Sequence, residues 1–193
     1  GPISRTPGIS ARPRRVPVDG GHLSVVDEGS GPAVVFVHGN PSWSFLFRDL
    51  ILDLRRNFRC VAPDHLGCGL SDRQSRPLRM RDHSENLQTV LDELGIDRYL
   101  LVAHDWGGAI GAHFAGRQPE RVVGMVFTNT AAFRLKRMPW QIRLARVPLL
   151  GRFLMEKCNL FATGAAKQGV VNPLSIAVSD GLLWPWIDPK NRR

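Results

Sequence analysis

The sequence of 193 residues lacks any apolar run near the length of about 20 residues that a membrane-spanning helix needs. It also lacks the short apolar segment of a secretory signal near its start. Residues 1–17 contain no acidic side chain and four prolines, and prolines disfavour an amphipathic targeting helix. We therefore expect residues 1–15 to be a flexible basic leader and the protein to be cytoplasmic.

Cysteine is scarce, and no two cysteines are spaced as in a CxxC motif. The three cysteines are Cys60, Cys68 and Cys158. An odd count without a CxxC pair argues for reduced thiols and against a disulfide framework or a zinc site. The six histidines are scattered and form no HExxH pattern. The sequence thus predicts no metal site.

Acidic residues are scarce in the last third of the chain. Residues 134–193 hold 11 basic and 3 acidic side chains, a net charge of +8, whereas residues 1–133 come to +1. A basic segment can indicate nucleic acid or anionic lipid as a partner. Here the basic residues are dispersed among Leu, Pro and Trp, so we interpret them as solvated helix faces. We expect no nucleic acid and no membrane among the partners.

Strand-like and helix-like segments alternate along the first two thirds of the chain. Strands are expected at 16–18, 22–27, 33–37, 58–62, 100–103 and 122–127, and helices at 43–56, at 82–94 and after the strand at 100–103. This alternation predicts an α/β fold, with a mostly parallel sheet and helices on both faces.

The character of the sequence changes after Phe133. Residues 134–186 show several short helical patterns, prolines and no good strand. Helical insertions after a strand of such a sheet commonly act as lids. We therefore predict a core over 16–133 and a helical cap or lid over 134–193, with the boundary near Arg134. The aromatic and apolar content of this lid suggests a small apolar substrate. The residues concerned are Trp140, Phe153, Leu154, Phe161 and Trp184.

The segment YLLVAHDWGGAIG at 99–111 joins an apolar strand to a helix rich in small residues. Asp105 stands where a nucleophile elbow places its reactive side chain, clear of the sheet. A carboxylate is already ionised at neutral pH, so Asp105 could displace a leaving group from a saturated carbon and form an ester. An isolated Asp before a helix would more simply be an N-cap. The small residues Ala103 and Gly107 around it favour the nucleophile.

A second motif, HGNP at 38–41, follows the strand at 33–37. Ligands of open α/β sheets bind outside the carboxyl ends of the strands, so this turn should face the elbow. Backbone amides of Trp106 and near Asn40 would form an oxyanion hole. The Asn40 amide and the Trp106 indole are also uncharged donors that suit a departing halide. Taken alone, Asn40 would be an ordinary turn residue before proline.

Four segments resemble haloalkane dehalogenases of the α/β-hydrolase superfamily. They are HGNPSWSF (38–45), APDHLGCGLSD (62–72), VAHDWGGAIG (102–111) and TNTAAF (128–133). The resemblance implies hydrolysis of a carbon–halogen bond to an alcohol, a halide and a proton, without metal or cofactor. By matching motif, Asp105 would be the nucleophile, and Asn40 and Trp106 would hold the halide.

The sequence departs from this family at the acid and the base. The resemblance implies a base histidine after the last strand and a carboxylate partner. At one position used for the carboxylate the sequence has Asn129, so it looks like subfamilies that place the acid one strand later. The only histidine after Asp105 is His113, which we expect to point away from the site. We therefore expect a C-terminally truncated, partial dehalogenase.

Three other interpretations stay open. Epoxide hydrolases also use an elbow Asp but activate the epoxide with lid tyrosines, and the only tyrosine here is Tyr99. Fluoroacetate dehalogenases bind their substrate through Arg just after the elbow, where this chain has residues 107–110, GGAI. The chain could also be a catalytically dead homologue, either a binding protein or the relic of a decayed gene.

Overall fold

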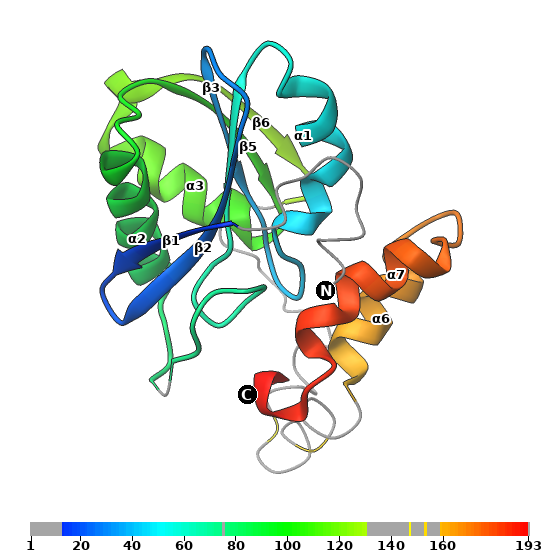
Figure 1. Ribbon diagram of the computed structural model, residues 1–193. Helices are drawn as coiled ribbons and strands as arrows, with labels where there is room; N and C mark the ends of the chain where they lie inside the picture. Colours follow the sequence, from blue (N-terminus) through cyan, green and yellow to red (C-terminus); the bar gives the residue numbers. More distant parts are fainter. Residues whose placement is uncertain (1–12, 75, 131–146, 148–152, 154–158, 193) are drawn as a thin grey trace. The chain divides into compact units, whose positions relative to one another are not determined.

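Six strands form one sheet in the order β1-β2-β4-β3-β5-β6 (Figure 1). The computed structural model describes residues 13–74, 76–130, 147, 153 and 159–192. The strands are β1 (Arg14–Val18), β2 (Gly21–Glu28), β3 (Ala33–Val37), β4 (Arg59–Pro63), β5 (Tyr99–His104) and β6 (Val122–Thr128). The pairs β4–β3, β3–β5 and β5–β6 are parallel, and β1–β2 and β2–β4 are antiparallel. The predicted mostly parallel sheet is confirmed.

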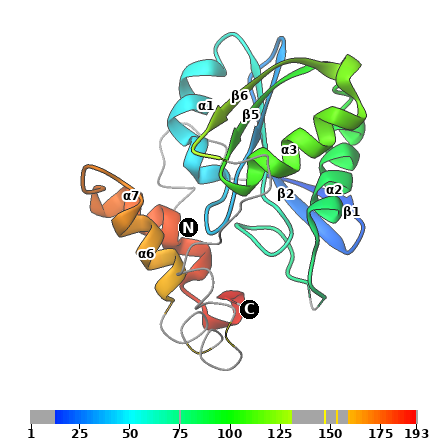
Figure 2. The ribbon, with the colours of Figure 1, turned by 180° about the vertical axis from the view of Figure 1, so that it is seen from behind.

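Helices cover both faces of this sheet, as the sequence predicted (Figures 1 and 2). They are α1 (Arg48–Leu54), α2 (Met80–Glu93) and α3 (Trp106–Arg117). Because side chains alternate along a strand, β3 contributes Val35 to the core beneath α2 and α3, and Val34 and Phe36 to the core beneath α1. Because β4, β3 and β5 are parallel, their carboxyl ends meet at one edge of the sheet.

Two predicted helix starts and one predicted leader boundary were wrong. The helix expected over 43–56 begins as a 3₁₀ helix, Ser44–Phe47, and becomes α-helical only over Arg48–Leu54. The helix expected from 82 begins at Met80, because Asp82 accepts from the Arg79 backbone as the acidic member of a capping box. Arg14 and Arg15, expected in the leader, are the first residues of β1. Residues 1–12 lie outside the described residues.

β6 forms one edge of the sheet among the described strands. It pairs with β5, and the exposed fraction of its apolar side chains is high. These side chains are Val123 (63%), Met125 (49%), Val126 (45%) and Phe127 (42%). An apolar strand with unpaired backbone groups on one side is a template for further pairing.

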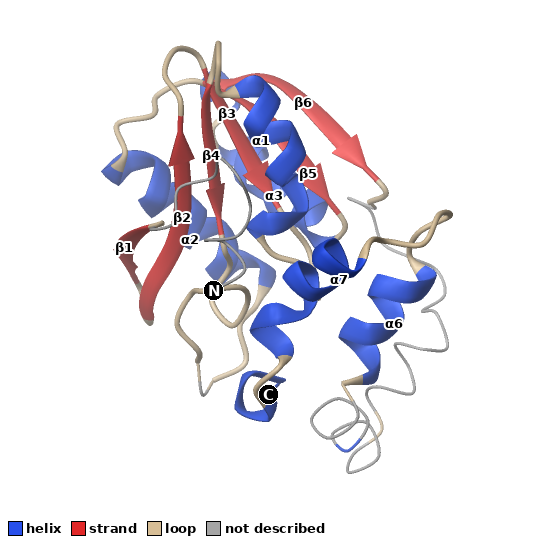
Figure 3. Ribbon diagram, turned by 45° about the vertical axis from the view of Figure 1, so that its right-hand side comes forward, coloured by secondary structure: helices blue, strands red, loops and turns tan. Residues whose placement is uncertain are grey.

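The chain divides into two units, one of Ile3–Phe133 and one of Arg134–Arg193. In the second unit the described segments are helical: α6 (Leu160–Gln168), α7 (Ile176–Leu183) and two short 3₁₀ helices, Trp184–Trp186 and Pro189–Arg192 (Figure 3). Among the described residues, no helix combines the length and apolarity that crossing a bilayer would require. Of the expected lid residues, Trp140 and Leu154 lie outside the described residues.

Candidate active site

Asp105 occupies a strained turn between β5 and α3. Its backbone φ is 52° and its ψ is −129°, a region that residues other than glycine rarely adopt. Two donors hold its carbonyl oxygen: the Gly108 amide at 3.0 Å and the Thr130 hydroxyl after β6. Thr130 is a site residue that the sequence reasoning missed, although it lies within the TNTAAF segment.

The glycines after Asp105 are required by close backbone packing. A Cβ atom on Gly107 would lie 2.0 Å from the carbonyl oxygen of Val37, at the end of β3. A Cβ atom on Gly108 would lie 2.0 Å from the Thr130 hydroxyl oxygen. Both distances are far below van der Waals contact, so any larger residue would push the elbow away from its neighbours. The sequence pattern of a nucleophile elbow therefore has its expected physical basis.

The structure brings the HGNP turn against Asp105. The Asn40 backbone N–H donates to Oδ2 of Asp105 at 3.0 Å. Gly39 permits this approach, because a Cβ atom there would lie 2.2 Å from the same carboxylate oxygen. Oδ1 of Asp105 accepts no hydrogen bond from the residues that the structure describes. The Asn40 amide thus holds one of the two carboxylate oxygens of Asp105.

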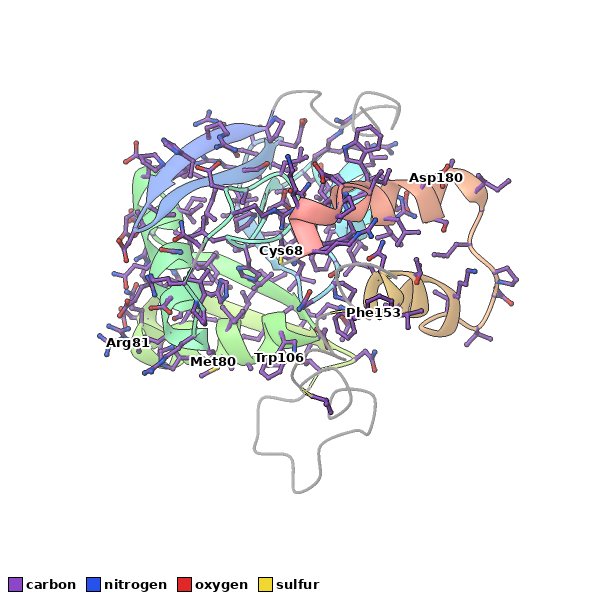
Figure 4. All side chains as sticks on the ribbon, turned by 90° about the horizontal axis from the view of Figure 1, so that it is seen from below. Cys68, Met80, Arg81, Trp106, Phe153 and Asp180 are labelled. Carbon is purple, nitrogen blue, oxygen red and sulfur yellow. The ribbon has the colours of Figure 1, made fainter. Side chains whose placement is uncertain are left out.

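Trp106 follows Asp105 as the first residue of α3. Its side chain is 56% exposed, and Figure 4 shows it at the start of that helix. The indole makes no hydrogen bond to another described residue. The structure thus places Trp106 next to Asp105 in the chain, and no hydrogen bond joins the described Trp106 indole and Asn40.

His38, the first residue of the HGNP turn, and His65 are hydrogen-bonded to each other's backbone. Nδ1 of His38 lies 2.8 Å from the Gly39 carbonyl oxygen, and its Nε2 accepts from the His65 backbone N–H at 2.9 Å. A carbonyl can only accept, so His38 carries its proton on Nδ1. Nε2 of His65 lies 3.0 Å from the His38 carbonyl oxygen. Burial is the main cause that lowers the pKa of His38 to about 4, and it also lowers the pKa of His65.

Asp64, which precedes His65, is fully buried at the end of β4. Its Oδ1 accepts from the Ser44 amide at 2.8 Å, and its Oδ2 accepts from the Leu70 amide at 3.0 Å. Burial raises the pKa of Asp64 to about 6, and these two backbone donors partly oppose that shift. Asp64 and His65 belong to the APDHLGCGLSD segment, and the sequence alone predicts no role for them. Their contacts are visible only in the folded chain.

The two positions that departed from the dehalogenase pattern also have defined places. Nδ1 of His113 lies 3.0 Å from the Ser84 hydroxyl, at the contact of α3 with α2. Asn129 follows β6 with a φ of 44°. The expectation that His113 points away from the elbow agrees with its contact to α2. Among the described residues, no group of three or more His, Cys, Asp or Glu side chains could hold a metal ion.

A mostly parallel sheet covered on both faces, with a carboxylate on a strained elbow after a central strand, defines an α/β hydrolase. A family model described as alpha/beta hydrolase fold matches residues 32–158. The chain therefore belongs to the α/β-hydrolase fold family.

Within this family the chain is similar to two kinds of enzyme. It is 38% identical over 182 residues to a cis-3-alkyl-4-alkyloxetan-2-one decarboxylase of Shewanella oneidensis, covering 90% of this chain and 57% of that protein. It is 49% identical over 111 residues to haloalkane dehalogenase 2 of Mycobacterium tuberculosis, covering 57% of this chain and 39% of that one. The crystal structure of haloalkane dehalogenase DbeA from Bradyrhizobium elkani matches with a TM-score of 0.84 and 28% identity, over 93% of this chain and 65% of that chain. The chain thus spans less than two thirds of each of these proteins.

Proposed function

We propose that this chain carries the nucleophilic half of a haloalkane dehalogenase site. The observation that carries the proposal is the contact between the Asn40 amide and the Asp105 carboxylate at a strained elbow. This contact orients the carboxylate of a side chain that the elbow raises above the sheet. The substrate class is small apolar haloalkanes, with water as second substrate and halide as product. The cytoplasm is the proposed compartment.

The first step is displacement at a saturated carbon. Oδ1 of Asp105 attacks the carbon that bears the halogen, a C–O bond forms, and the C–halogen bond breaks. The electron pair of that bond leaves with the halide, and an alkyl ester of Asp105 remains. Because Oδ2 is held by the Asn40 backbone, the approach of Oδ1 is directed rather than free.

The leaving halide needs hydrogen-bond donors that stabilise its negative charge. We assign this role to the side-chain amide of Asn40 and the indole N–H of Trp106. Both are neutral donors, and both belong to residues beside Asp105. Donors that are in place before the reaction stabilise the charge as it develops and require no reorganisation.

Hydrolysis of the ester needs a base that deprotonates water, and the balanced products are an alcohol, a proton and the regenerated carboxylate. His113 contacts Ser84, and His38 and His65 bond to each other's backbone. These histidines are therefore engaged elsewhere. For the 193-residue chain we propose ester formation without rapid hydrolysis.

Decarboxylation of an oxetan-2-one is a second candidate, favoured by the similarity to the Shewanella enzyme over most of this chain. Attack of Asp105 on ring carbon C4 would break the C4–O bond and leave a free carboxylate on C3. Loss of carbon dioxide would then form the C3–C4 double bond and expel Asp105. These two reaction steps consume no water and need no base, so Asp105 could catalyse them repeatedly.

Intact-protein mass spectrometry after incubation with a 1-bromoalkane tests the proposal. We expect one alkyl adduct and at most one bromide released per protein. Asp105→Ala should abolish the adduct, whereas Asp49→Ala, which removes a carboxylate exposed on α1, should retain it. An unmodified wild-type chain, or an adduct that persists in Asp105→Ala, would contradict the proposal. Parallel incubation with a cis-3,4-dialkyloxetan-2-one, with carbon dioxide as readout, tests the second candidate.

A further inference from the structure

The loop at residues 38–44 joins β3 to the first 3₁₀ helix and carries Asn40 near its middle. Its two ends contact two consecutive residues, Asp64 and His65, that follow β4. β4 is the parallel neighbour of β3, so both segments leave the same edge of the sheet. The loop that contacts Asp105 is therefore fixed by two described residues, Asp64 and His65, that make no hydrogen bond to Asp105.

His65 holds the first end of the loop by two hydrogen bonds. Its backbone N–H donates to Nε2 of His38 at 2.9 Å, and its ring Nε2 donates to the His38 carbonyl at 3.0 Å. The centroids of the His38 and His65 rings are 4.4 Å apart. His65 is 6% exposed and His38 is fully buried. Removing either partner would leave a buried polar group without its hydrogen bond.

Asp64 holds the other end of the loop. Its Oδ1 accepts from the Ser44 amide, and its Oδ2 accepts from the Leu70 amide. A Cβ atom on Gly69 would lie 2.3 Å from the Asp64 carboxylate, so the backbone closes tightly around it. A buried carboxylate that bonds two separate backbone segments locks their spacing.

Within the loop, three hydrogen bonds converge on the Gly39 carbonyl oxygen. This oxygen accepts from Nδ1 of His38 and from the backbone and hydroxyl of Ser42, at 2.8, 3.2 and 3.1 Å. With both ends held and the middle closed, Asn40 has little freedom to leave Asp105. Its amide is placed before any substrate arrives.

We propose that Asp64 and His65 are positioning residues that hold the Asn40 loop against Asp105. The expected effect of these residues on ester formation rests on the proposed function. The placement of the Asn40 amide is a separate property of the fold. Neither residue contacts the reacting atoms, and both act through the backbone of 38–44.

The contact between His38 and the His65 backbone requires a neutral His38 ring. Nε2 of His38 accepts a hydrogen bond, so a proton there would break it. The titratable groups that face this pair are His83 on α2, His104 on β5 and Asp64. Two of these are further histidines whose protonation would add repulsion. Acidification should therefore loosen the Asn40 loop.

Three substitutions in the 193-residue chain test this role. His65→Leu removes the ring donor, and His65→Gln keeps an amide donor near the position of Nε2. His113→Leu is the matched control, because it removes a histidine hydrogen bond at the contact of α2 and α3. Two readouts are compared at pH 7.5 and pH 5: hydrogen exchange of the Asn40 amide by NMR, and the rate of Asp105 alkylation by a 1-bromoalkane.

At pH 7.5, His65→Leu should speed exchange of the Asn40 amide by about tenfold and slow alkylation by about 100-fold, the scale of a misplaced catalytic group. His65→Gln should restore most of the amide protection and most of the alkylation rate. His113→Leu should leave both quantities at their wild-type values. At pH 5, the wild-type Asn40 amide should keep most of its protection, once the intrinsic pH dependence of exchange is corrected for, because the pKa of His38 is about 4 and its ring is still mostly neutral there; the protection should be lost as the pH falls below 4. Unchanged exchange in His65→Leu, or equal changes in His113→Leu, would overturn the inference. If the wild-type chain forms no ester, the proposed function fails, and the exchange data alone decide the positioning role.

Discussion

The backbone amide of Asn40 donates to the Asp105 carboxylate over 3.0 Å, between residues 65 positions apart in the sequence. The pairing depends on β3 and β5 being hydrogen-bonded neighbours, with Val37 opposite Ala103 in the parallel register. β5 ends at His104, one residue before Asp105, and β3 ends at Val37, three residues before Asn40. The contact is therefore set by the sheet and not by either motif alone.

Replacing Trp106 with Phe should weaken both halide binding and ester formation. The substitution keeps an aromatic ring and removes the indole N–H, so it isolates the donor. We expect slower alkylation by about 100-fold, the scale for the loss of one preorganised donor. Quenching of tryptophan fluorescence by bromide should also weaken, with sodium sulfate at equal ionic strength as the control. Unchanged alkylation would remove Trp106 from the mechanism.

Two glycines of α3 should respond in opposite directions to the same change. Gly107→Ala would place a methyl group 2.0 Å from the Val37 carbonyl oxygen. We expect this substitution to lower the free energy of unfolding by about 3 kcal/mol or more. Gly116→Ala meets no atom within 4 Å and should stabilise the helix by about 0.5–1 kcal/mol. Urea unfolding of both variants checks this. Equal midpoints would mean that the elbow is looser than described.

The exposed edge of β6 should make the 193-residue chain associate. Unpaired backbone groups and apolar side chains favour strand pairing between copies. Val123→Lys places a charge on this strand and should shift the chain toward monomer. Val171→Lys, at a fully exposed position of the second unit, should not. Size-exclusion chromatography over a range of concentrations distinguishes these outcomes, and a monodisperse concentrated wild-type monomer would contradict the expectation.

Stability should fall as the pH is lowered from about 7 to 4. Burial lowers the pKa of His38 from 6.5 to about 4, and it also lowers the pKa of His65 and His83. The unfolded chain therefore binds more protons in this range, and the free energy of unfolding decreases with falling pH. Asp64, whose pKa burial raises to about 6, acts in the opposite direction, because its folded form gains the proton first.

Three histidines against one carboxylate leave the unfolded chain with an excess of up to two bound protons. At about 1.4 kcal/mol for each proton, we expect the free energy of unfolding to fall by up to about 2.8 kcal/mol per pH unit. His83→Gln removes one of these protons and should flatten the profile. Urea midpoints measured at several pH values give the slope. A profile that is flat or rises toward pH 4 would contradict the assignment of buried neutral histidines.

The sequence by itself determined the alternation of elements and the two reactive motifs. Strands at 33–37 and 122–127 were predicted to within a residue, because β-branched and apolar runs bounded by turn residues have few other stable conformations. The elbow at Asp105 was also predictable. Its small residues follow from backbone clashes that any such turn must avoid.

Only the tertiary structure decided which residues hold those motifs in place. Thr130, Asp64 and His65 have no local pattern that distinguishes them from turn residues, because their partners lie 25, 20 and 27 positions away. The same holds for the helix start at Ser44, whose backbone amide is bound by a carboxylate from another loop. Local sequence fixes the conformations that a short segment prefers. Hydrogen bonds between distant segments form only when the sheet brings strand ends together, and the site takes its geometry from them.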